Sequence, residues 1–188
     1  MMKIIGLVGA IGSGKSTVAS YIENYGYARV RFSTPLKNMF RAIGLTHRHI
    51  EGDLKEEPSE ILSGCTPRYC MQTLGTEWAR NIIDKNFWTN IWGKEAKKHR
   101  QVVAEDCRFP NEAQAIRLLG GEVWAIKRNG YEFHGHSSET EMGDIIPDKI
   151  ILNNSSIEVL EMFVRQALIK GAETDNNDID GDYLWRRK

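Results

Sequence analysis

The chain has 188 residues, of which 41% are hydrophobic and 27% are charged, values that fit one globular domain with a sizeable core. Its 25 lysines and arginines balance its 25 aspartates and glutamates, which argues against a generally basic nucleic-acid binder and favours a small partner over a polymer. The apolar start is about five residues long, far short of the ~20 that a membrane-spanning helix needs. Three cysteines (Cys65, Cys70 and Cys107) without metal-ligand spacing indicate reduced thiols, so we expect a cytoplasmic protein that binds no membrane.

The first predicted element is a short buried strand that ends in a glycine-rich loop. Residues Lys3–Val8 (KIIGLV) are apolar and partly β-branched, which favours a strand. Residues Gly9–Ser16 (GAIGSGKS) match the pattern G-x-x-x-x-G-K-[ST], and Val18, Ile22 and Tyr25 then recur at helical spacing. This position between a strand and a helix distinguishes a phosphate-binding loop from an ordinary glycine turn.

The loop has the chemistry of a nucleoside-triphosphate site. Glycines allow several backbone N–H groups to point at one anion, and the N-terminus of the following helix adds partial positive charge. The Lys15 ammonium group can reach the terminal phosphates as a catalytic residue, and the Ser16 hydroxyl can ligate Mg²⁺. We therefore expect ATP with Mg²⁺, bound by Ile11, Gly12, Ser13, Gly14, Lys15, Ser16 and Thr17.

The segment up to residue 98 is predicted to be mostly helical. After a second strand over Tyr27–Phe32, Ser33-Thr34-Pro35 has the hydroxyl cap and first-turn proline of a helix start. Residues 47–60 are polar and are predicted to form a loop. Further helices are expected from Thr66 to Ile83 and from Phe87 to Lys98. In the first of these, one polar stripe is formed by residues at four-residue intervals, Arg68, Gln72, Thr76 and Arg80.

The rest of the chain alternates strands with helices and ends in an acidic segment. The strands are expected over 101–104, 122–126 and 149–152, and helices are expected up to Leu119 and over 157–169. Residues 129–147 are predicted to be a loop with one short helix near 138–143, and residues 171–188 a flexible tail.

This order of elements predicts an α/β fold of the three-layer P-loop NTPase type. Strands that alternate with helices form a parallel sheet covered on both faces, here with five strands. Ligands of such sheets bind at the carboxyl ends of the strands. Ser33, Arg108 and Arg128 each follow a predicted strand, as does the glycine-rich loop, so we expect them to converge on one edge.

The acidic pair after the strand QVVA offers a second magnesium ligand. A carboxylate at such a strand end can hold Mg²⁺ directly or through water. Asp106 is the first candidate and Glu105 the alternative; a solvated acidic strand end is the non-functional reading. Because phosphoryl transfer spreads negative charge over several oxygens, arginines are expected to neutralise it, with Arg108 and Arg128 as catalytic candidates.

These motifs together resemble the phage-type deoxynucleoside monophosphate kinases, a branch of the P-loop nucleoside monophosphate kinases. The similarity covers nearly all of residues 3–170. The most specific of the matching segments is EDCRFPNEA (Glu105–Ala113). The others are GAIGSGKST, FSTPLK (Phe32–Lys37), TPRYCMQTLGTEWAR (Thr66–Arg80), HSSE (His136–Glu139) and PDKIILNNSSIEVL (Pro147–Leu160).

The resemblance implies transfer of the ATP γ-phosphate to a deoxynucleoside 5′-monophosphate, for use in nucleotide biosynthesis. It implies Lys15 and Ser16 for Mg·ATP, and Asp106 and Arg108 between the two phosphate groups. Arg128 and His136–Glu139 resemble the lid and nucleotide-contact region. The residues it implies for acceptor binding are Ser33, Lys37, Arg68, Gln72, Arg80, Arg108 and Glu139.

Two other functions stay open at this point. One is a P-loop kinase of another small metabolite, such as dephospho-coenzyme A or phosphomevalonate, and the other is an ATP-binding module without transfer chemistry. We expect a kinase domain over residues 1–170, with an acceptor-binding excursion over 45–98 and a lid-like loop over 129–147. A homodimer is an alternative to a monomer that the sequence does not decide.

Overall fold

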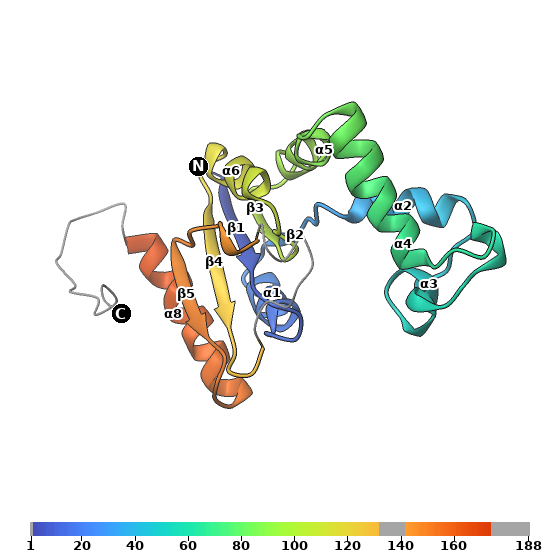
Figure 1. Ribbon diagram of the computed structural model, residues 1–188. Helices are drawn as coiled ribbons and strands as arrows, with labels where there is room; N and C mark the ends of the chain where they lie inside the picture. Colours follow the sequence, from blue (N-terminus) through green and yellow to red (C-terminus); the bar gives the residue numbers. More distant parts are fainter. Residues whose placement is uncertain (1, 132–141, 174–188) are drawn as a thin grey trace.

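The computed structural model describes residues 2–131 and 142–173, and its centre is a five-stranded parallel sheet (Figure 1). The strands are β1 (Lys3–Val8), β2 (Ala28–Arg29), β3 (Gln101–Ala104), β4 (Glu122–Lys127) and β5 (Lys149–Leu152). They are arranged in the order β2-β3-β1-β4-β5, so the predicted sheet is confirmed in strand number and direction.

Helices cover both faces of this sheet, as the alternation of its apolar residues requires. On one face Ile5 and Leu7 of β1 pack with α1 (Lys15–Glu23) and α8 (Ile157–Glu173). On the other face Ile4 and Val8 pack with α5 (Phe87–Ala96) and α6 (Pro110–Leu118). The three-layer α/β architecture is therefore the one expected.

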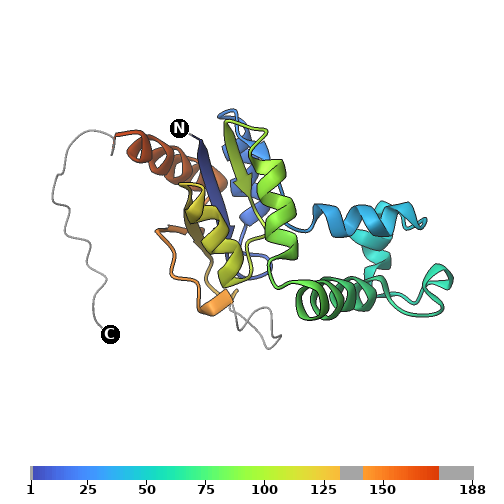
Figure 2. The same cartoon turned by 90° about the horizontal axis from the view of Figure 1, so that it is seen from above.

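A helical lobe extends from one side of the sheet between β2 and α5 (Figures 1 and 2). It has a small apolar core of its own, formed by Phe40, Leu45, Ile50 and Met71. Its elements are α2 (Thr34–Ala42), α3 (His47–Ile50), the 3-10 turns η1 (Asp53–Glu56) and η2 (Glu60–Leu62), α4 (Pro67–Gln72) and the π-helix η3 (Thr73–Ile83).

Three local predictions differ from the structure. The second strand is only Ala28–Arg29, residues 47–60 contain short helical turns, and the helix from Thr66 changes to π-helical hydrogen bonding at Thr73. The short helix expected near 138–143 falls largely outside the described residues. No helix of the described segments is long and apolar enough to cross a membrane.

Candidate active site

The glycine-rich loop curls between β1 and α1 around the side chain of Lys15. The Lys15 Nζ donates to the carbonyl oxygens of Gly9 at 2.6 Å and Ala10 at 2.8 Å, which holds the ammonium group at the mouth of the loop. Gly14 caps α1 with φ 101°, in the left-handed region that favours glycine, and no side chain caps the first amides of the helix. Such amides and an ammonium group have the chemistry to bind a polyphosphate.

Two neighbouring elements hold the loop in this shape. Asn153, directly after β5, donates from Nδ2 to the Ser13 carbonyl at 2.8 Å. The Tyr131 ring lies so close to Gly12 that a Cβ there would come within 2.4 Å of it. The Arg128 guanidinium lies 4.9 Å from the centre of this ring. Arg128 and the loop are thus brought together through Tyr131.

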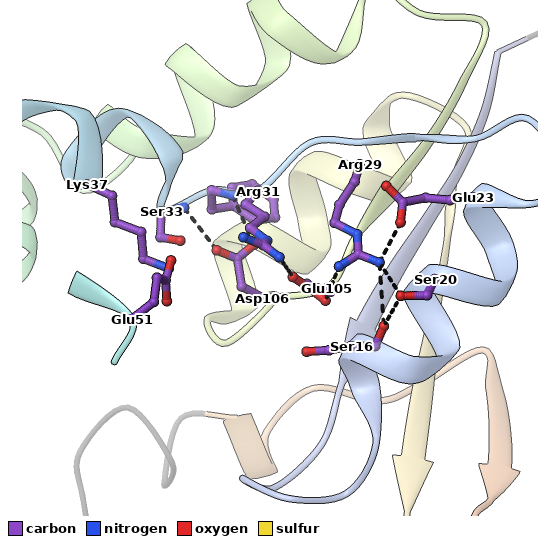
Figure 3. Close-up of polar contacts among 11 residues, drawn as sticks. Ser16, Ser20, Glu23, Arg29, Arg31, Ser33, Lys37, Glu51, Glu105 and Asp106 are labelled. Carbon is purple, nitrogen blue, oxygen red and sulfur yellow. Dashed lines mark hydrogen bonds and ion pairs between the residues drawn. The ribbon is translucent and has the colours of Figure 1, made fainter. Parts of the chain in front are cut away.

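Glu105 is a buried carboxylate at the end of β3 that contacts two arginines (Figure 3). Its Oε2 lies 3.3 Å from Nη1 of Arg29, and its Oε1 forms an ion pair with Arg31. Arg29 also donates to the Ser16 carbonyl at 3.5 Å, so the same guanidinium connects the end of β3 to the first turn of α1. Because two cations already neutralise Glu105, Asp106 is the better candidate for a metal ligand.

Asp106 has a second role, which is to hold the start of the helical lobe. Its two carboxylate oxygens accept the backbone N–H groups of Phe32 at 2.9 Å and Ser33 at 3.0 Å. A carboxylate has further lone pairs, so these bonds leave it able to face a magnesium ion or its water. The Ser33 hydroxyl is buried without a hydrogen-bond partner among the described residues, as expected for a group reserved for a ligand.

Cations from three elements of the lobe, α2, η1 and α4, lie near one another. Lys37 of α2 contacts Glu51 at 2.7 Å, and Arg68 of α4 forms an ion pair with Glu56. Burial and the charges of Arg68 and Lys37 lower the pKa of Lys55, against the effect of Glu51 and together with a smaller effect of Arg108. Burial raises the pKa of Glu51, but Lys37, Lys55 and Arg31 outweigh it and lower that pKa overall.

Two cations in and beside this group have no carboxylate partner among the described residues. In the described part of the chain, neither Lys55 nor Arg108 forms an ion pair. Such an excess of positive charge, with Lys55 half-buried and Arg108 exposed, favours an anion of the size of a phosphate group.

Arg80 belongs to a separate cluster at the other end of the lobe. Its Nη2 lies 2.6 Å from Oε1 of the buried Glu112, and its guanidinium lies 3.9 Å from the centre of the Phe109 ring. The structure therefore does not place Arg80 among the cations around Lys55. Gln72 is exposed on α4, while Glu139 and His136 lie outside the described residues.

Four residues of the site were not predicted individually from the sequence. Tyr131 follows Arg128 after a glycine turn, and Asn153 ends the strand KIIL, so position relative to a strand end could have indicated both. Glu112 could have been found as the third residue after the helix cap, where glutamate caps the backbone. Lys55 carries no such signal, because it is one lysine in a polar stretch.

Comparison with known proteins identifies the family. The family model described as deoxynucleotide monophosphate kinase matches residues 47–164, which is more than half of the chain. A curated protein of Acanthamoeba polyphaga mimivirus, named provisionally as a deoxynucleotide monophosphate kinase, is 37% identical over 176 residues, which cover 84% of this chain and 91% of that protein.

Solved structures at lower identity share the fold. TT1252 from Thermus thermophilus superposes with a TM-score of 0.52 at 17% identity, over 90% of this chain and 97% of its own. A gluconokinase from Sinorhizobium meliloti 1021 superposes with a TM-score of 0.50 at 15% identity, over 92% of this chain and 94% of its own. The family match and the viral relative, for their part, show that the chain belongs to the deoxynucleotide monophosphate kinase family and is a nucleotide kinase.

Proposed function

We propose that the chain transfers the γ-phosphoryl group of ATP to a deoxynucleoside 5′-monophosphate and releases the diphosphate. The observation that carries this proposal is the pairing of two anion sites. The loop around Lys15 suits the triphosphate, and the cations around Lys55 and Arg108 suit the acceptor phosphate. Arg29, Glu105 and Arg31 form continuous contacts from the first turn of α1 toward the lobe.

Magnesium fits this site through oxygen ligands. The described residues contain no group of three or more histidine, cysteine, aspartate or glutamate side chains that could hold a metal ion. Mg²⁺ in phosphoryl-transfer sites is usually held by one or two protein oxygens, substrate phosphates and water, so such a group is not needed. The Ser16 hydroxyl and Asp106 would hold it, and the bound ion would neutralise charge on the phosphates.

The residues of the chain act by alignment and charge in this mechanism. The attacking group is an oxygen of the acceptor phosphate, which is already anionic near neutral pH, so no protein base is required. Lys15, Arg108 and Arg128 supply positive charge where negative charge develops during the transfer. Ser33, Lys37 and Arg68 hold the acceptor in position for attack in line with the leaving group.

A product assay tests this function. The protein is incubated with Mg·ATP and each deoxy- and ribonucleoside monophosphate in turn, and the nucleotides are then separated. We expect a diphosphate product from at least one deoxynucleoside monophosphate. ATP binding without a phosphorylated product from any monophosphate would contradict the proposal, and a product only from another class of metabolite would replace it.

Lys15→Ala is the matched loss-of-function variant. Because it removes the ammonium group at the mouth of the loop, we expect turnover to fall by more than about 100-fold. Circular dichroism and the unfolding midpoint should stay close to wild type, since the half-buried side chain of Lys15 belongs to neither apolar core. Near-normal turnover in this variant would show that the loop does not hold the transferred phosphate.

A further inference from the structure

We propose that Glu112 is a positioning residue that sets the helical lobe, and with it the acceptor site, relative to the sheet. This inference rests on the proposed function, because it concerns the placement of the acceptor. Glu112 lies in the first turn of α6 and is 2% exposed. Glu112 is not itself a predicted substrate-binding residue, but its partners Arg80 and Arg108 are.

The two oxygens of this carboxylate have different partners. Oε2 accepts the backbone N–H groups of Arg108 at 2.7 Å and Phe109 at 3.1 Å, which fixes the main chain at Arg108. Oε1 accepts from Nη2 of Arg80 at 2.6 Å. Arg80 belongs to η3, which continues directly from the helix that carries Arg68 and Gln72. One carboxylate therefore links the backbone of a predicted catalytic residue to the predicted acceptor helix.

The surroundings of the pair make this link rigid. The Arg80 guanidinium packs on the Phe109 ring, and its Nη1 donates to the Asn111 side chain at 3.4 Å. Asn111 in turn donates to the Lys85 carbonyl at 2.8 Å, where the chain returns from the lobe to α5. The returning connection is thus held from several directions, with Glu112 at the centre.

Capping alone does not require the charge that Glu112 carries above its raised pKa of about 7. A glutamine at the third helical position can accept the same backbone N–H bonds. A buried ion pair is also poor evidence for stability, because the cost of withdrawing two charges from water can exceed their attraction. The positioning of Arg80 through Oε1 explains why the residue is charged. Capping explains only the backbone hydrogen bonds that Oε2 accepts.

Kinetics of Glu112→Gln test the proposal. At about pH 8, above the pKa of Glu112, the isosteric amide keeps a backbone acceptor but loses the charge that orients Arg80. We expect the acceptor KM to rise about tenfold, which is the scale of one charge-assisted hydrogen bond. We also expect kcat to fall and the Kd for ATP, measured without acceptor, to stay unchanged. Glu95→Gln, which removes an exposed carboxylate on α5, is the control and should leave all three constants unchanged.

A double-mutant cycle distinguishes positioning from a general loss of structure. Because Arg80 and Glu112 act through one contact, the effect of Glu112→Gln should nearly vanish in an Arg80→Ala background. Three outcomes would each overturn the inference: additive effects in the cycle, an unchanged acceptor KM in Glu112→Gln, or an equal loss of ATP affinity. In each case an active wild type would still support the proposed function. A wild type without any diphosphate product would overturn both.

Discussion

The Glu112 carboxyl group lies among Arg80 from η3 and Asp106 and Cys107 from the segment before α6. Burial raises the pKa of Glu112 to about 7, while Arg80 and the Arg108 N–H lower it and Asp106 raises it further. The ordinary value for this group is 4.5. The folded protein therefore keeps the proton of Glu112 over a pH range in which the unfolded chain has lost it.

This shift predicts a pH dependence of stability. Since the folded state binds more protons between about pH 4.5 and 7, the contribution of Glu112 to the free energy of unfolding is present below this window and is lost as pH rises through it. We expect wild type to lose on the order of 2 kcal/mol relative to Glu112→Gln across the window.

Urea unfolding of both proteins between pH 5 and pH 8 measures this difference. A Glu112→Gln variant that is as stable as wild type or more stable at about pH 8, yet less active, would separate positioning from stabilisation. A stability difference that stays constant with pH would show that Glu112 has no raised pKa.

At the scale of elements, α4 is expected to act as the acceptor helix through Arg68. The variant Arg68→Ala removes one guanidinium group from the cations around Lys55. It should raise the acceptor KM by about 10-fold or more and leave the ATP KM within about twofold of wild type. Arg48→Ala is the matched control, because Arg48 also forms an exposed ion pair within the lobe, with Asp53. Steady-state kinetics with each substrate varied in turn test this, and equal effects on both KM values would remove Arg68 from the acceptor site.

The sequence predicted the sheet well because its central strands β1, β3 and β4 are buried and strongly apolar. β1, β3 and β5 have the predicted bounds, and β4 is one residue longer. The second strand is shorter than expected for a local reason. After Val30 donates to Val103, the backbone N–H groups of Phe32 and Ser33 donate to Asp106 instead of to a strand neighbour. A contact between residues 74 positions apart has no trace in local periodicity.

The helix from Thr66 to Ile83 illustrates a second limit. Its four-residue spacing of polar side chains suits an α-helix, but from Thr73 the backbone adopts the wider π-helical turn. The Trp88 indole donates to the Gly75 carbonyl at 2.8 Å, so tertiary contacts help to set this geometry. The four-residue spacing placed Arg80 on the same predicted polar stripe as Arg68. In the structure, Arg80 contacts Glu112 on α6.

At the scale of the molecule, the sheet and the lobe have separate apolar cores. Ile50 is fully buried among lobe residues and Ile22 is fully buried against the sheet, which makes the two a matched pair for substitution. Each isoleucine-to-alanine change should cost about 2–5 kcal/mol where its own core unfolds. The core that loses stability should determine whether acceptor binding or ATP binding is weakened.

We therefore expect Ile50→Ala to weaken acceptor binding and to make the lobe sensitive to protease, while ATP binding stays near wild type. Ile22→Ala should instead weaken ATP binding together with overall stability. Limited proteolysis and equilibrium binding of each nucleotide measure these effects. Equal loss of both ligands in Ile50→Ala would show that lobe and sheet unfold as one unit.

The segment from Asp106 to Glu112 holds both places where the chain passes between sheet and lobe. Asp106 binds the outgoing chain at Phe32 and Ser33, and Glu112 with Asn111 binds the returning chain at Arg80 and Lys85. One short segment of the sheet domain thus holds the lobe at both of its connections. A chimaera that exchanges residues 33–85 between two relatives should inherit the nucleobase preference of the donor only when residues 105–112 are exchanged with them.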